Sequence, residues 1–104
     1  MFVMETAEER VAAGAEWLDA AKPEWPTLVN RETLDLASCG NCILGQVFAE
    51  EAEAQGYGDG YTMHLDIIGW DHLGIVADRG FAGVNPEDYV LLHTAWLAEL
   101  NRRG

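Results

Sequence analysis

Two cysteines, Cys39 and Cys42, stand three residues apart in the segment Ser38-Cys39-Gly40-Asn41-Cys42-Ile43-Leu44-Gly45-Gln46. This spacing places both thiols at the expected start of a helix, where the helix dipole lowers the pKa of a thiol and a C-x-x-C pair can form a disulfide. Thioredoxin-like enzymes carry such a motif after a strand of a βαβ sheet. The segment before Cys39 is too short for that arrangement, so a thiol–disulfide site is an alternative interpretation of the pair.

A zinc site is the second chemistry that this pair suggests. Two cysteines at this spacing are half of a structural zinc site, which needs four ligands. The histidines that would complete it are His64, His72 and His93, but their spacing does not match a zinc finger. A homodimer would instead supply two cysteines from each chain. In the third and favoured interpretation both cysteines are small apolar residues on the packed side of a helix, and no cofactor is expected.

The remaining polar residues form no catalytic signature. His93 falls within an apolar stripe, and His64 and His72 have acidic neighbours but no nucleophile elbow near them. The glycine-rich segment 56–60 lacks the Lys-Ser/Thr pair that follows a phosphate-binding loop. We therefore predict that the protein is not an enzyme.

The net charge of the chain argues against direct binding to nucleic acid. Eighteen acidic residues against six basic ones give a formal net charge of −12, while 49% of the residues are apolar. Such acidity opposes direct binding to nucleic acid and favours a solvated surface or a basic partner. A decoy that imitates nucleic acid is a further alternative. The chain has neither a signal-peptide core nor an apolar run of about 20 residues, so we expect no membrane contact and a cytoplasmic location.

Helical periodicity dominates the pattern of apolar residues. It predicts helices over 5–21, 39–54, 71–79 and from Pro86 to Arg103. Thr6 and Glu9 have the spacing of a capping box for the first helix, and Asn85 is the expected N-cap of the last. The fold class is therefore mainly α, a single domain over 1–104 built as a bundle of about four helices. Alternation of apolar residues near 61–67 leaves one short strand as an alternative.

Two features of the predicted elements suggest an interaction surface. Glu50, Glu51 and Glu53 crowd the C-terminal end of the predicted 39–54 helix, where the helix dipole disfavours negative charge. Trp25 stands between two prolines in an irregular stretch. We therefore expect these four side chains to contact a protein partner, with a homodimer as the other form of association.

Several segments together carry a resemblance to a known family. They are Gly14–Asp19, Pro23-Glu24-Trp25, Leu34–Gln46, Arg79-Gly80-Phe81, Tyr89 and Thr94-Ala95-Trp96. Together they resemble a family of small proteins of actinobacteriophages and their actinobacterial hosts, and the Ser-Cys-x-x-Cys-x-Leu-Gly-Gln segment is the most specific part. The resemblance implies a setting in the bacterial host cell and supplies no catalytic residues. It suggests an accessory protein that acts by binding a host protein.

Overall fold

The computed structural model describes residues 6–66, 69 and 76–103 of the chain. Six helices follow one another along these residues: α1 (Ala7–Ala21), α2 (Trp25–Leu28), α3 (Ile43–Val47), α4 (Ala49–Ala54), α5 (Gly60–Asp66) and α6 (Pro86–Arg103). No strand occurs in the same ranges, which confirms a mainly α fold. None of the helices in this part of the chain has both the length and the apolar character of a membrane span.

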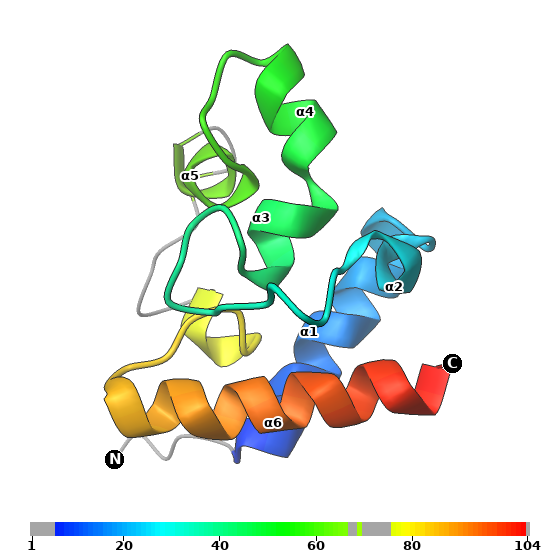
Figure 1. Ribbon diagram of the computed structural model, residues 1–104, viewed down its shortest axis with the longest axis vertical. Coiled ribbons are helices and arrows are strands. Elements are labelled where there is room, and N and C mark those ends of the chain that lie inside the picture. The colour runs from blue at the N-terminus through cyan, green and yellow to red at the C-terminus, as the bar shows by residue number, and fades with distance from the viewer. Residues whose placement is uncertain (1–5, 67–68, 70–75, 104) are drawn as a thin grey trace.

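Helices α1 and α6 are the two long elements, and they cross each other along one edge of the molecule (Figure 1). Helix α6 begins at Pro86 as predicted, and α1 begins at Ala7, two residues into the predicted range but directly after the predicted cap Thr6. The Thr6 hydroxyl oxygen accepts a hydrogen bond from the Glu9 N–H at 3.2 Å, and the Asn85 side-chain oxygen accepts one from the Asp88 N–H at 2.9 Å. A Cβ atom at Gly14 of α1 would stand 2.1 Å from the Arg79 carbonyl oxygen and 3.1 Å from the Trp96 ring of α6. The absence of a side chain at Gly14 therefore permits the turn at Arg79 to approach α1 closely, beside the crossing with α6.

A buried ion pair ties the start of α6 to α1 and to the turn before it. Arg10 is only 2% exposed, and its Nη1 donates to Asp88 Oδ1 at 2.8 Å. Its Nε and Nη2 donate to the carbonyl oxygens of Ala77 and Ala82, at 2.9 and 3.2 Å. Since a buried charge is tolerated only when it is paired and hydrogen-bonded, this arrangement holds the three segments in one geometry.

The aromatic residues meet in the core, and Trp25 is one of them. Its ring is 0% exposed and lies edge-on to Trp96, with 5.7 Å between the ring centroids. Its indole N–H donates to Asp19 Oδ1 at 3.0 Å, and the Arg103 guanidinium lies over the ring at 5.2 Å. The prediction that Trp25 is displayed to a partner is therefore wrong, because this side chain is enclosed within the fold.

The predicted helix over 39–54 is two helices, and it begins later than expected. The N-cap is Cys42, whereas a helix starting at residue 39 would have Ser38 as its cap. Helix α3 ends at Val47, and Phe48 is both its C-cap and the N-cap of α4. Phe48 is buried and its ring packs edge-on to His64, with centroids 4.5 Å apart. Glu50 and Glu51 consequently lie in the first turn of α4, where the helix dipole favours carboxylates. The predicted conflict with the dipole is therefore absent for Glu50 and Glu51, whereas Glu53 lies in the last turn of α4.

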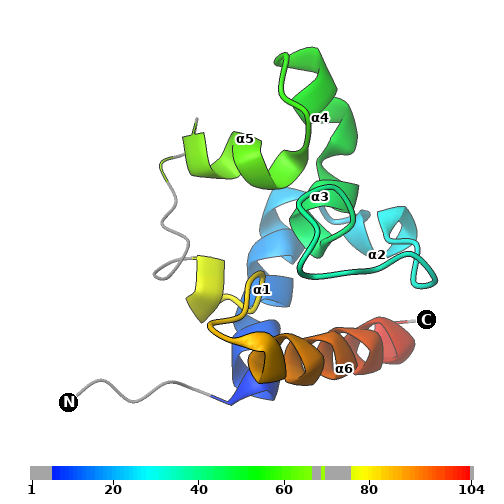
Figure 2. The same ribbon diagram turned by 60° about the vertical axis from the view of Figure 1, so that its left-hand side comes forward.

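The alternative of a strand near 61–67 is also wrong, because residues 60–66 form α5 (Figure 2). Asp59 caps this helix by accepting a hydrogen bond from the Thr62 N–H at 2.6 Å. Gly60 packs against α3, where a Cβ would stand 2.3 Å from the Leu44 carbonyl oxygen. This close packing, together with the cap, decides in favour of the helix.

Most of the predicted helix over 71–79 lies outside the described residues. Its end is described. Residues 76–78 form a helical turn closed by Gly80 at φ +73°, with the Phe81 N–H donating to the Val76 carbonyl at 3.0 Å. The residues Arg79-Gly80-Phe81, a glycine just past the predicted helix followed by an apolar residue, are typical of such a Gly-terminated helix end.

Candidate functional site

The cysteine segment, residues 38–46, consists of a loop that leads into the first turns of α3. The Cys42 sulfur accepts a hydrogen bond from the Gly45 N–H at 3.3 Å and so caps the helix. Gly45 has no room for a side chain, because a Cβ would stand 2.2 Å from the Cys39 carbonyl oxygen. The Gln46 amide nitrogen donates to the carbonyl oxygens of Asn30 and Asn41, at 3.3 and 2.9 Å. The distinctive residues of this segment thus have structural roles in closing one loop.

The two thiols lie in different environments. Cys39 is exposed and precedes α3, whereas Cys42 is buried, and both are free. The expectation that both lie on the packed face of a helix therefore holds for Cys42 alone. Burial raises the pKa of the Cys42 thiol to about 11, despite its place at a helix N-terminus. Because the thiolate is the reactive form, the structure gives Cys42 no activation for redox chemistry.

Neither His64 nor His93 forms a metal-binding cluster with the cysteines in the described part of the chain. His64 is buried in α5, with its Nδ1 2.7 Å from the Gly60 carbonyl oxygen, and His93 lies on α6. His72 lies outside the described residues. Within residues 6–66 and 76–103, no group of three or more His, Cys, Asp or Glu side chains is arranged to hold a metal ion.

The acidic residues proposed to meet a partner lie on α4, with different exposures. Glu50 and Glu53 are exposed, while Glu51 is half-buried and pairs with Lys22. Burial alone would raise the pKa of Glu51, but the hydrogen bond and the charge of Lys22 hold it below its ordinary value. Glu51 thus contributes to the fold, and only Glu50 and Glu53 of these three are left facing solvent.

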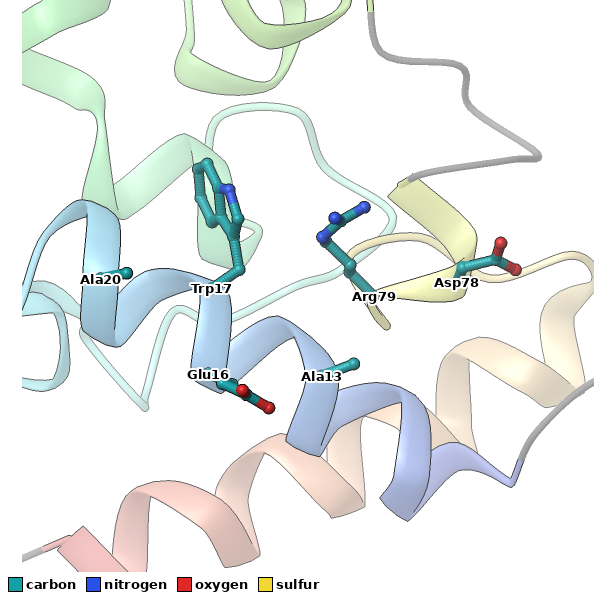
Figure 3. Close-up of a pocket in the computed structure, with 6 residues that line it drawn as sticks. All are labelled: Ala13, Glu16, Trp17, Ala20, Asp78 and Arg79. Atoms are coloured by element: carbon teal, nitrogen blue, oxygen red, sulfur yellow. The ribbon is translucent and has the colours of Figure 1, made fainter.

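A broad depression of about 580 Å³ lies between α1 and the turn at 77–79 (Figure 3). Trp17 and Arg79 point toward this space from opposite walls, while Asp78 points away from it. Trp17 also packs edge-on to His64 and Phe81, at centroid distances of 5.7 and 6.1 Å. Both Trp17 and Arg79 are already engaged with other groups of the protein, so neither is a free recognition group.

A second concave surface is more apolar and lies beside the first half of α6. It consists of two adjoining depressions, of about 550 and 270 Å³, that share Ala37 and Tyr89. Val84 and Val90 flank them with exposed fractions of 42% and 66%. The complete lining, which we call the α6 groove, is Asp35, Leu36, Ala37, Gly83, Val84, Asn85, Pro86, Tyr89, Val90, His93 and Thr94.

The backbone around Tyr89 shapes this groove. A Cβ at Gly83 would stand 2.9 Å from the Tyr89 ring, so the ring lies directly against the chain before α6. Asp35 holds the opposite wall, since its side chain accepts a hydrogen bond from the Ala37 N–H at 3.0 Å. These two contacts help to fix the positions of the two walls of the groove.

Sequence reasoning did not find the α6 groove. The signal that was available is the pair Val90-Leu91, since two large apolar residues on the side of the helix opposite Leu92 and Trp96 have no place in the core. Its other wall, at residues 35–37, is distant in the sequence, and only the fold brings it to α6.

Comparisons with protein-family models, with curated protein sequences and with solved structures found no match. The resemblance to actinobacteriophage proteins accordingly stays an interpretation of the sequence.

Proposed function

We propose that this protein acts by binding another protein, without catalysis, and that the α6 groove is the surface it uses. The observation that carries this proposal is the apolar lining of the groove on a chain with a net charge of −12. Exposed apolar patches with a polar rim are typical of protein-binding surfaces. Val84 and Val90 are exposed to solvent in the isolated chain, and a partner bound in the groove would bury them.

The charge around the groove indicates the chemistry of the partner. Asp35 lines one depression, and Pro86, which lines the other, is followed in the sequence by the exposed Glu87. A complementary partner inserts an apolar side chain between basic residues, because opposite potentials across an interface speed encounter and exclude wrong partners. Together with the family resemblance, this supports a host protein as the partner, in the cytoplasm of the bacterial cell.

Photo-crosslinking tests the location of this surface. A photoreactive phenylalanine replaces Val84 in one variant and Glu53, on the exposed side of α4, in a control variant. After irradiation in actinobacterial cells, we expect one discrete adduct from position 84 and none from position 53. When Ala37→Asp is added to the variant with the photoreactive residue at position 84, the adduct should disappear. Adding Ala54→Asp instead should leave the adduct unchanged. Equal adducts at both positions, or indifference to Ala37→Asp, would show that the groove is not the binding surface.

The other two interpretations receive less support. The zinc or thiol–disulfide alternative lacks a cluster of ligands among the described residues and an activated thiol at Cys42. The nucleic-acid mimic needs free carboxylates in rows, but Asp19, Asp88 and Glu99 are engaged in ion pairs within the fold. Both alternatives stay predictions from the sequence.

A further inference from the structure

The outward face of α6 is apolar in the middle and charged at both ends. Leu91 is 54% exposed, and Thr94 and Ala98 continue the same face at helical spacing. Glu87 begins this face, and Arg102, whose side chain is 73% exposed, ends it. A helix that buries Leu92, Trp96 and Leu100 on one side therefore carries a second, uncovered face with opposite charges at its two ends.

A depression runs beside the second half of this face, between α6 and α1. It has a volume of about 300 Å³, and small side chains form its floor. Its apolar lining is Val11, Ala12, Ala95 and Ala98, and its polar lining is Glu8, Thr94, Glu99 and Arg102. The depression and the projecting Leu91 lie on the same helix, about 10 Å apart along its axis, since Leu91 and Ala98 are seven residues apart.

We propose that two copies of this chain associate through the outward faces of α6, with the helices antiparallel. A two-fold axis beside Thr94 and Ala95 places Leu91 of each copy against Ala98 of the other. The same register brings Glu87 of each copy opposite Arg102 of the other. The two-fold axis thus places a Leu91 side chain at the α1–α6 depression of each copy and pairs the charged ends of the two helices. The same contacts occur twice, as an isologous interface requires.

Charge complementarity selects a second copy over other occupants of this face. The chain has only six basic residues, and two of them, Arg102 and Arg103, end α6. Arg103 is held by Asp19 and Glu99 within the fold, whereas Arg102 pairs with Glu99 and still exposes 73% of its side chain. An antiparallel copy presents an acidic first turn to that basic end twice, whereas a parallel helix would oppose like charges. Against this association stands the repulsion between two chains of net charge −12. A single pair of helices also buries less area than stable dimers do. We therefore expect a dissociation constant in the micromolar range.

Charge reversal at the two ends gives a test with an internal rescue. Glu87→Arg and Arg102→Glu are each expected to weaken the dimer roughly tenfold or more, because each turns two attractive contacts into repulsive ones. The double variant restores the opposite pairing and should return the dissociation constant to near that of the wild type. Leu91→Glu places a charge in the depression of the partner and should give a monomer. Sedimentation velocity over a concentration series measures each constant.

Glu53→Arg on α4 is the matched control for the change in net charge. It alters the charge by the same two units as Glu87→Arg, so it should leave the dimer unchanged or slightly tighter as the repulsion falls. Thermal unfolding of each variant verifies that the monomer is folded, which is expected because Glu87, Leu91 and Arg102 are exposed.

A wild-type chain that stays monomeric at high concentration would overturn the proposal, as would a dimer whose dissociation constant is unchanged by Leu91→Glu. If the double variant does not recover the dissociation constant of the wild type, the proposed antiparallel register of the two helices is wrong. Ala37→Asp, in the α6 groove, should leave the dimer intact, so the two proposals fail separately.

Discussion

Replacing Asp88 by asparagine tests the buried ion pair that organises the start of α6. In the native protein the Asp88 carboxylate accepts from Arg10 Nη1 at 2.8 Å and from the Val84 N–H at 3.0 Å. The amide of the variant keeps one oxygen acceptor, but its NH₂ group faces either the guanidinium or the backbone donor. Arg10 is then left buried without a counter-ion, while its bonds to the Ala77 and Ala82 carbonyl oxygens remain.

The expected cost follows from the burial of both partners. Breaking a buried pair by removing one charge costs about 3–5 kcal/mol. For a chain of 104 residues the entropy of unfolding converts each kcal/mol into about 4–5 °C. We therefore expect Asp88→Asn to lower the melting temperature by about 12–25 °C.

The pH dependence of stability has a definite sign. Burial alone would raise the pKa of Asp88, but the hydrogen bonds from Arg10 and Val84 and the charge of Arg10 hold it below its ordinary value near 3.8. The carboxylate therefore stabilises the fold above that pH. This contribution is lost as the pH falls below about 3.8, and the variant should lack this part of the acid sensitivity.

Thermal and urea unfolding monitored by circular dichroism give the measurement. Glu87→Gln, one residue earlier in the same turn of α6, is the control and should change stability by less than about 0.5 kcal/mol. The Arg10→Met variant and the double variant complete a cycle, in which the two losses should overlap and not add. A loss below about 1 kcal/mol for Asp88→Asn, or full additivity with Arg10→Met, would refute the reasoning.

Two further predictions concern the thiols and His64. At pH 8 a thiol reagent should modify Cys39 quickly and Cys42 at least about 100-fold more slowly, because Cys42 is buried and its pKa is raised from 9.0 to about 11. Two equally fast thiols in the native protein would contradict this, and denaturant should make both react. Burial lowers the pKa of His64 below 6.5, although its bond to the Gly60 carbonyl opposes the shift. The unfolded chain therefore takes up a proton before the folded one, and stability should fall as the pH drops below about 6.5. A His64→Leu variant should lose this slope in urea unfolding between pH 7 and pH 5, and an unchanged slope would assign the effect to other groups.

Elements with strong local signals were predicted well from the sequence. The starts of α1 and α6 follow from Thr6 and Asn85, whose side chains cap helices through contacts within three residues. The glycine-terminated turn at Gly80 follows from the same kind of local geometry. Each of these features depends on neighbours in the chain, so a single sequence contains the information.

Features that depend on distant contacts were missed or misplaced. The break at Phe48 goes with its packing against His64, and α5 forms where an alternating pattern equally suggests a strand. Trp25 stands between two prolines in a stretch predicted to be irregular and was expected to contact a partner, yet it packs against Trp96 and donates to Asp19 inside the fold. In each case the residues in contact are separated in the sequence. The periodicity of the apolar residues therefore does not reveal these contacts.

The sequence by itself determined the helical class, the caps of the long helices and the acidity of the surface, because these follow from composition and from contacts within one helical turn. Only the tertiary structure decided that Cys42 is a buried cap, that Arg10 is a buried cation, and that residues 35–37 and α6 together form an apolar groove. Burial and counter-charge come from segments far apart in the chain. The chemistry of a side chain in this protein is therefore known only once its neighbours in space are known.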